Sequence, residues 1–426
     1  MRLVVGPSRV EGAAAIPASK SHTLRALTIA TLAEGESTIL NPLESLDARS
    51  GARAAGALGA RVEFAEGEWR VTGVGGRPSS AGGVVDVGNS GVTLRMMLSA
   101  AALAKGRTEF TGDEQIRRRP LGPLLQALTD LGAPAKSLGG NGCAPCEVTG
   151  PMRGGETQVA CPTSQYLSSL LVSTPLAPGD STIAVTELNE APYVDMTLWW
   201  LDACGIRCER DGHERFTIPG GQSYEGFRRE IPGDWSSATL VMAAAAVAGG
   251  TVELTGLRQD DPQGDRRVAD VLAEMGAGVE RGEESVRVTG GDLAGGEFDL
   301  NDIPDALPAL AVCAAVAEGE TRFVNVPQAR IKEVDRIAAL HEELAKMGVS
   351  CEELPDGLVV RGGGSGALRG ARVSGRGDHR MVMALAVAGL VAAGETVIET
   401  AEAMAVTFPT FAGIMRGIGA SIGMEE

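Results

Sequence analysis

AEGESTIL, at residues 33–40, is the first of six copies of one pattern, and this repetition decides the fold. Each copy joins the end of an Ala-rich helix to a glycine and then to a short strand. A glycine directly after such a helix is typical of a left-handed helix cap, and the β-branched residues that follow are typical of strands. The anchor glycines recur about 70 residues apart, and they are Gly35, Gly106, Gly179, Gly249, Gly319 and Gly394.

Each copy continues with a second helix, which ends in a sequence such as ALGA at 57–60 and is followed by an alternating strand. Between the copies lie further helices that are rich in Ala and Leu and poor in charge, over 92–104, 165–176, 236–248, 305–318 and 380–393. Helices of this composition should be buried between sheets and other helices. The pattern therefore predicts an α/β protein in which each unit reads strand, helix, strand, helix, strand.

The length predicts two domains, because 426 residues exceed one ordinary core and suit two of about 200 residues. Near the midpoint, residues 210–235 are polar and contain Gly-Gly and Pro-Gly pairs, which are typical of a crossover. We expect a first lobe over 15–230 with copies one to three. The second lobe should combine 1–14, including a strand from Arg2 to Val5, with 231–426. A cleft between two such lobes is where ligand sites tend to lie.

Charge and composition exclude several classes of function. The net charge of −17 argues against a general nucleic-acid binder, and an aromatic content of 4% argues against base-stacking platforms. The four His and seven Cys, including the pair Cys143 and Cys146, do not form a spacing typical of a metal site. No apolar run is long enough for a membrane span and no signal-peptide pattern is present, so we expect a cytoplasmic protein.

The stretch PASKSHTLRALTIATL, at 17–32, predicts a helix whose first turn carries Lys20 and Ser21. Arg25 follows one turn later and reaches the same surface. A hydroxyl, an ammonium and a guanidinium at a helix start favour an anion. An ordinary capped helix with solvated charges has the same pattern.

Similar polar clusters precede or begin other helices of the chain. Each one alone is also typical of a helix cap, a tight turn or a solvated charge run. Repeated in almost every unit, the clusters together predict a receptor for a multiply charged anion. They are Gly88–Gly91, Arg117–Arg119, Pro162–Gln165, Asp302–Asp305, Lys332–Arg336 and Asp378–Arg380.

Eight ordered motifs resemble the enolpyruvyl transferase family over essentially the whole chain. They are SKSHTLRAL (19–27), VGNSGVTLR (87–95), TSQYL (163–167), PYVDMTL (192–198), IPDA (303–306), RIKEVDR (330–336), GDHRM (377–381) and TFPTF (407–411). The chain is most similar to the branch that forms 5-enolpyruvylshikimate-3-phosphate. The branch that acts on UDP-N-acetylglucosamine is less similar, because Ser21 replaces its Asn and residues 111–120 lack its reactive Cys.

The resemblance implies a two-lobed inside-out α/β barrel, with three βαβαββ repeats in each lobe. It implies transfer of the enolpyruvyl group from phosphoenolpyruvate to the 5-hydroxyl of shikimate-3-phosphate. Phosphate would leave through a tetrahedral intermediate as the lobes close. The expected partners are these two small molecules, with no metal, organic cofactor, nucleic acid or membrane, and the protein is expected to be a monomer.

The resemblance also implies three groups of site residues. Proton transfer is assigned to Lys20, Asp305, Glu333 and His379. Phosphoenolpyruvate is assigned to Lys20, Gly91, Arg119, Gln165, Arg336 and Arg380. The acceptor is assigned to Lys20, Ser21, Arg25, Thr163, Ser164, Gln165, Tyr193, Asp305, Gln328 and Lys332.

Departures from the family pattern keep alternatives open. Val92 replaces a Thr, Val406 replaces a Lys that would hold the phosphate of phosphoenolpyruvate, and Gln328 replaces an Asn. Glu190 replaces a Ser that would contact the phosphate of the acceptor, and a carboxylate there would repel it. An enolpyruvyl transferase with a different acceptor, or a non-catalytic relative, therefore remains an alternative.

Overall fold

The computed structural model describes residues 1–426, which divide into two compact lobes. The first lobe is Lys20–Ile231, and the second lobe joins Met1–Ser19 to Pro232–Glu426.

The repeated pattern of the sequence folds into six four-stranded sheets, three in each lobe. In each sheet one edge strand runs parallel to its neighbour, and the other two pairings between adjacent strands are antiparallel. The prediction of an α/β fold built from six repeated units is confirmed.

The sheets of the first lobe, in strand order, are β14 (Arg228–Glu230), β3 (Glu36–Leu40), β5 (Glu68–Thr72), β4 (Arg61–Ala65); β6 (Val84–Asp86), β7 (Gly106–Thr111), β9 (Cys146–Gly150), β8 (Ala135–Ser137); and β10 (Gly155–Cys161), β11 (Ser181–Leu188), β13 (Arg215–Ile218), β12 (Glu209–Asp211). The sheets of the second lobe are β16 (Gly278–Arg281), β17 (Ser285–Thr289), β15 (Thr251–Thr255), β2 (Gly12–Ala15); β18 (Glu297–Asp299), β19 (Glu318–Val324), β21 (Gly357–Gly363), β20 (Ser350–Leu354); and β22 (Arg372–Ser374), β23 (Thr396–Glu399), β1 (Arg2–Gly6), β24 (Ser421–Glu425).

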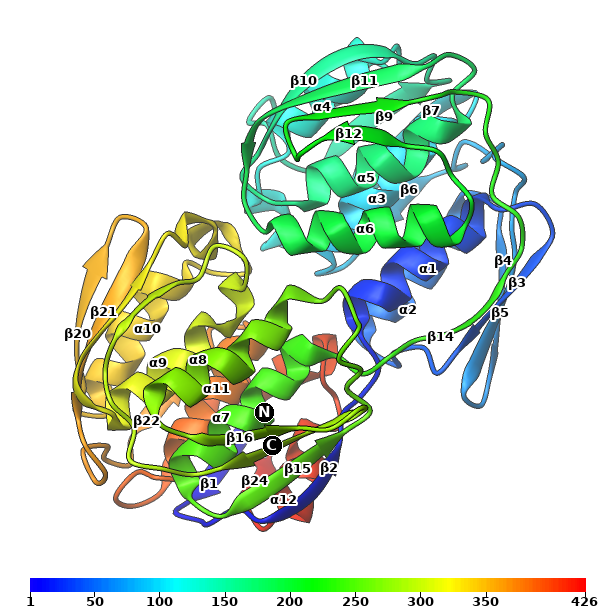
Figure 1. Ribbon diagram of the computed structural model, residues 1–426. Helices are drawn as coiled ribbons and strands as arrows, with labels where there is room; N and C mark the ends of the chain where they lie inside the picture. Colours follow the sequence, from blue (N-terminus) through cyan, green and yellow to red (C-terminus); the bar gives the residue numbers. More distant parts are fainter. The chain divides into compact units, whose positions relative to one another are not determined.

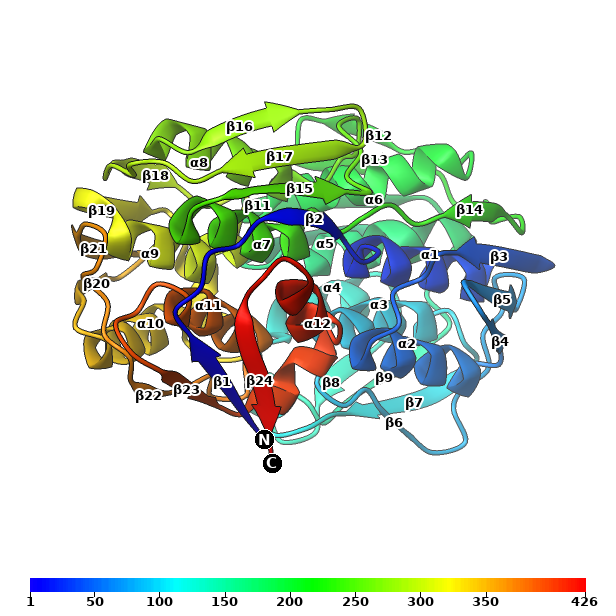
Figure 2. The same ribbon diagram turned by 90° about the horizontal axis from the view of Figure 1, so that it is seen from below.

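The N-terminal segment completes two sheets of the second lobe. Strand β1 pairs antiparallel with both β23 and β24, beside which it lies in Figure 2, and β2 pairs parallel with β15. The chain stays with this lobe up to Ser19, whose N–H donates to Pro232 O at 2.8 Å. Residues 15–19 therefore pack with the second lobe, whereas the sequence placed them in the first.

Three helices in each lobe are buried along most of their length. They are α1 (Lys20–Leu32), α3 (Gly91–Ala101) and α5 (Gln165–Ser173) in the first lobe, and α7 (Trp235–Ala248), α9 (Leu307–Val316) and α11 (His379–Gly389) in the second. Helices α7, α9 and α11 pack on one another in the core of the second lobe (Figure 1). Their Ala-rich and Leu-rich sequences explain this position, because no helix face is polar.

The other helices expose one side. They are α2 (Leu46–Ala57), α4 (Gly122–Asp130), α6 (Ala191–Ala203), α8 (Val268–Met275), α10 (Arg336–Lys346) and α12 (Phe411–Gly417). The strands that face solvent also bury alternate residues, as in β5 and β17, so each lobe has sheets around buried helices. None of the helices combines the length and the apolar character that crossing a membrane requires.

The predicted polar clusters lie where the chain leaves a strand and enters a helix. The side chains of Ser90, Asp234 and Asp378 cap α3, α7 and α11. Most of the cluster at 332–336 precedes its helix, because α10 begins at Arg336. Asp335 is extended there and its carboxylate accepts from Ala338 N at 3.1 Å, which makes it the cap.

Candidate anion-binding sites of the two lobes

Lys20 begins α1 in the first lobe and pairs with Asp47, a carboxylate to which the sequence assigns no role. Its Nζ lies 3.4 Å from Asp47 Oδ2, and both side chains are largely buried. Asp47 lies in the first turn of α2, which packs against α1. The positive charge at the start of α1 is therefore held in place by the next helix along the chain.

Arg25 is buried and joins α1 to α6. Its Nε donates to Thr197 Oγ1 at 2.8 Å, and its Nη2 donates to Tyr193 O at 2.7 Å. Its Nη1 donates to Ser21 O at 3.1 Å. Burial lowers the pKa of Arg25 to about 10. Arg25 thus fixes the position of the two helix starts that carry Ser21 and Tyr193.

Gly91 lies against two guanidinium groups at the start of α3. A Cβ atom at Gly91 would lie 2.6 Å from Arg119 Nη1 and 2.7 Å from Arg95 Nη1, so only glycine fits without displacing them. Arg95 also donates through Nη1 to Gln165 Oε1 at 2.8 Å, and burial lowers the pKa of Arg95. The predicted residues Gly91, Arg119 and Gln165 therefore meet, and Arg95 connects them.

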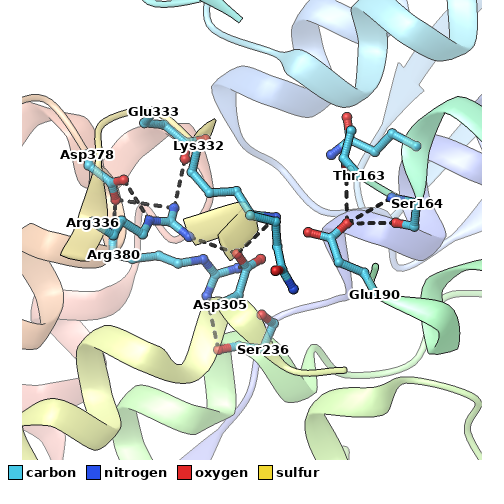
Figure 3. A network of polar contacts seen from close by, with 12 residues as sticks. Thr163, Ser164, Glu190, Ser236, Asp305, Lys332, Glu333, Arg336, Asp378 and Arg380 are labelled. Atoms are coloured by element: carbon cyan, nitrogen blue, oxygen red, sulfur yellow. Dashed lines mark hydrogen bonds and ion pairs between the residues drawn. The ribbon is translucent and has the colours of Figure 1, made fainter. Parts of the chain in front are cut away.

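The start of α5 is already in contact with a carboxylate. Glu190 Oε2 accepts from Thr163 Oγ1 at 3.1 Å, from Ser164 Oγ at 2.8 Å and from Ser164 N at 3.1 Å. Figure 3 shows the Glu190 side chain pointing toward both residues. The donors that the sequence assigned to the acceptor thus hold an anionic group of the chain itself.

Arg336 is the centre of a carboxylate cluster in the second lobe. Its Nε donates to Asp378 Oδ2 at 2.8 Å, and its Nη1 and Nη2 donate to Asp305 Oδ1 and Glu333 Oε2, both at 2.7 Å. Burial alone would lower the pKa of Arg336, but the attraction of Asp378, Glu333 and Asp305 outweighs it and raises this pKa. Arg336 therefore keeps its charge although it is buried.

Asp305 is contacted by three cations of the second lobe, as Figure 3 shows. Besides Arg336, its carboxylate lies 2.9 Å from Arg380 Nη2 and 3.7 Å from Lys332 Nζ. Arg380 also donates through Nη1 to Ser236 O at 3.4 Å. Three cations around one carboxylate can hold a carboxylate or phosphate of a ligand in the same way.

The two remaining assigned residues of the second lobe, Gln328 and His379, are also buried. Both are close in sequence to residues of this cluster. His379 is the first residue of α11 and is 1% exposed. Gln328 lies in a 3-10 turn over Pro327–Ile331, and its Nε2 donates to Asn301 O at 2.9 Å. Its donor is therefore directed to the protein backbone.

Sequence reasoning missed the residues that hold the assigned side chains in place. Asp378 belongs to the predicted cluster Asp378–Arg380 but had no role of its own, and Arg95 lies in the VGNSGVTLR motif, so both roles could have been found from the sequence. Thr197 likewise lies in the PYVDMTL motif, whereas Asp47 carries no comparable signal, because its partner Lys20 lies on another helix. Val92 and Val406, which depart from the family pattern, are both half-buried.

Comparisons with known proteins agree with this architecture. The family described as EPSP synthase (3-phosphoshikimate 1-carboxyvinyltransferase) matches residues 4–415. A 3-phosphoshikimate 1-carboxyvinyltransferase from Acetivibrio thermocellus is 52% identical over 426 residues, which is all of both chains. One from Ruminiclostridium cellulolyticum is 50% identical over 422 residues, or 99% of each chain.

A solved structure of EPSP synthase from Acinetobacter baumannii has the same fold. It superimposes with a TM-score of 0.82 at 26% identity and covers 99% of this chain and 100% of its own. By fold and by sequence over its whole length, this chain belongs to the EPSP synthase (3-phosphoshikimate 1-carboxyvinyltransferase) family.

Proposed function

We propose that this protein transfers the enolpyruvyl group of phosphoenolpyruvate to the 5-hydroxyl of shikimate-3-phosphate, a step of aromatic biosynthesis in the shikimate pathway. Its relatives over the full length carry the name of this transferase activity. The observation that supports the proposal most directly is the cluster of Arg336, Arg380 and Lys332 around Asp305. Such a cluster provides cations for the anionic donor beside a carboxylate that can move protons.

In the proposed reaction Arg336 and Arg380 hold the carboxylate of phosphoenolpyruvate. Lys20 and Arg119, with Gln165 and the turn at Gly91, hold its phosphate. Two guanidinium groups suit a planar carboxylate because each can donate two parallel hydrogen bonds. For them to do so, Asp305 must give up part of its present contact with both arginines.

Shikimate-3-phosphate is assigned to donors and acceptors of both lobes. They are Lys20, Ser21, Arg25, Thr163, Ser164, Gln165, Tyr193, Asp305, Gln328 and Lys332. Arg25 would act by holding Ser21 and Tyr193, because three of its donated hydrogen bonds go to protein groups.

The chemistry needs a base and an acid near one pair of carbons. The 5-hydroxyl loses its proton as its oxygen attacks C2 of phosphoenolpyruvate, while C3 gains a proton to become a methyl group. The tetrahedral intermediate then loses a C3 proton and phosphate, which restores the double bond. We assign these proton transfers to Asp305, Glu333, Lys20 and His379, with closure of the two lobes to exclude water.

The reaction uses no metal or organic cofactor, so treatment with EDTA should leave activity unchanged. We further propose that the protein acts in the cytoplasm and as a monomer. All seven cysteines are free thiols, as expected for a reducing compartment. Size-exclusion chromatography with light scattering tests the oligomeric state.

The direct test is release of inorganic phosphate from phosphoenolpyruvate by purified protein, with and without shikimate-3-phosphate. We expect release only when both substrates are present, and 5-enolpyruvylshikimate-3-phosphate as the product by mass spectrometry. Binding of phosphoenolpyruvate without turnover would favour a different acceptor. No binding of phosphoenolpyruvate by calorimetry would contradict any enolpyruvyl transfer.

A further inference from the structure

Glu190 occupies a backbone position that recurs in other repeats of the fold. Its φ of 62° is left-handed, and the same conformation is found at Asn41, Gly256, Asn325 and Thr400. Each of these residues lies one or two positions after a strand that follows a buried helix. The strands are β3, β15, β19 and β23, and β11 for Glu190. The left-handed backbone at Glu190 is therefore a feature that several repeats share. None of the other four residues has a long anionic side chain.

In another repeat this position uses a neutral side chain for a similar contact. Thr400 Oγ1 accepts from Gly377 N at 3.0 Å, in the loop before the buried helix of its own repeat. Glu190 makes the corresponding contact with Ser164 N before α5. A hydroxyl is therefore sufficient to link the end of the second strand to the start of the buried helix, and the charge of Glu190 is not required for that link.

The Glu190 carboxylate occupies a set of donors suited to an anion. Its Oε2 receives three hydrogen bonds from Thr163 and Ser164, and Glu190 is 2% exposed. The partial positive charge at the start of α5 adds to the attraction. A phosphate bound to these donors would meet the carboxylate at close range, and two anions in a buried site repel each other strongly.

We infer that Glu190 is an internal anion that fills the phosphate subsite of the acceptor in the free protein and thereby sets the affinity for that acceptor. This inference rests on the proposed function, which assigns Thr163 and Ser164 to shikimate-3-phosphate. Binding of the acceptor requires the Glu190 carboxylate to leave these donors, and part of the binding free energy is spent on its displacement. Glu190 is thus a residue that tunes affinity at the acceptor site.

Two variants separate the charge from the structural link. Glu190→Gln keeps the length of the side chain and an oxygen acceptor but removes the charge. Glu190→Ser removes both the charge and the reach of the side chain. Glu187→Gln is the matched control, because Glu187 is an exposed carboxylate three residues away and the change in net charge is the same.

The experiment measures the Kd of shikimate-3-phosphate by calorimetry without phosphoenolpyruvate, and the KM of both substrates in turnover. We expect both Glu190 variants to bind the acceptor at least about tenfold more tightly than the parent protein. The KM of phosphoenolpyruvate should change much less than the Kd of shikimate-3-phosphate, and Glu187→Gln should match the parent protein in every value. Thermal unfolding confirms that the variants are folded.

A merely structural role for Glu190 gives a different result. Folded Glu190→Gln and Glu190→Ser variants would then show a lower Tm with unchanged or weaker acceptor binding. This result would overturn the inference. Turnover by the parent protein would still support the proposed function. A parent protein without turnover on these substrates would contradict the proposed function itself, and the inference with it.

Discussion

Arg336 and Asp378 form a buried ion pair in which Nε lies 2.8 Å from Oδ2, with side chains that are 1% and 0% exposed. Asp378 Oδ1 also accepts from the backbone N–H groups of Arg380 and Met381, at 2.8 and 3.2 Å. One carboxylate therefore caps α11 and orients the guanidinium that we assign to phosphoenolpyruvate.

Asp378→Asn should weaken the binding of phosphoenolpyruvate about 10-fold to 100-fold, because Arg336 loses its charged partner while the helix cap is kept. The Kd from calorimetry tests this, with the exposed Asp260→Asn as a control that should have no effect. An unchanged Kd in folded Asp378→Asn would mean that Asp305 and Glu333 alone orient Arg336.

Asp305→Ala and Glu333→Ala should each lower kcat about 100-fold or more, because each removes a carboxylate assigned to proton transfer. Steady-state phosphate release gives kcat, and circular dichroism confirms the fold. Asp305→Asn is the sharper variant, since it keeps the size of the side chain and removes its basicity. Unchanged kcat in both alanine variants would contradict the assignment of the catalytic carboxylates.

Gly91→Ala should weaken the binding of phosphoenolpyruvate, because the new methyl group would displace the guanidinium groups of Arg119 and Arg95. A displacement of this kind is expected to raise the KM about tenfold. Gly82→Ala is the control, because a Cβ atom there has no neighbour within 4 Å. Equal KM values for the two variants would show that the guanidinium groups move aside without loss.

Glu343 should make stability depend on pH in the acid range. Burial acts to raise the pKa of Glu343, but hydrogen bonds from Lys346, Ser374 N and Arg376 lower it below its ordinary value of 4.5. A carboxylate with a lowered pKa stabilises the folded state above the ordinary value, and this contribution is lost as the pH falls through the folded value.

Glu343→Gln should therefore reduce the free energy of unfolding at pH 7 by about 2 kcal/mol. The difference from the parent protein should shrink as the pH falls below 4.5. Urea unfolding at pH 7, 5 and 3.5 provides the measurement. A difference that stays constant over this range would mean that the charge of Glu343 is not responsible for its effect.

The seven cysteines should react slowly with a thiol reagent in the folded protein, because thiolate is the reactive form. Burial raises the pKa of Cys146, Cys161 and Cys313 to about 12. Ellman's reagent at pH 8 should detect all seven thiols only after unfolding. A fast thiol in the folded protein, or a count of five without reductant, would contradict this expectation.

The sequence predicted the repeats well, because their signals are local. A glycine after an Ala-rich helix and a β-branched run after the glycine depend on residues a few positions apart. Helices that are apolar on all faces are buried wherever they pack, so α7, α9 and α11 could be predicted as core helices from composition. The polar clusters at the helix starts were equally visible.

The partners of those clusters could not be predicted, because they are distant in sequence. Thr163 and Glu190 are 27 residues apart, and Arg336 and Asp378 are 42 residues apart. The sequence placed Glu190 where the phosphate of the acceptor is expected, but it did not show which groups the carboxylate contacts.

The sequence by itself determined the six α/β repeats, the buried helices and the residues that belong to an anion-binding family, because periodicity and helix caps act over short distances. Only the tertiary structure decided which strands complete each sheet, as when β14, near the end of the first lobe, pairs with β3 near its start. It also decided that Glu190 lies on Thr163 and Ser164, because the direction of a buried side chain depends on the packing of separate elements.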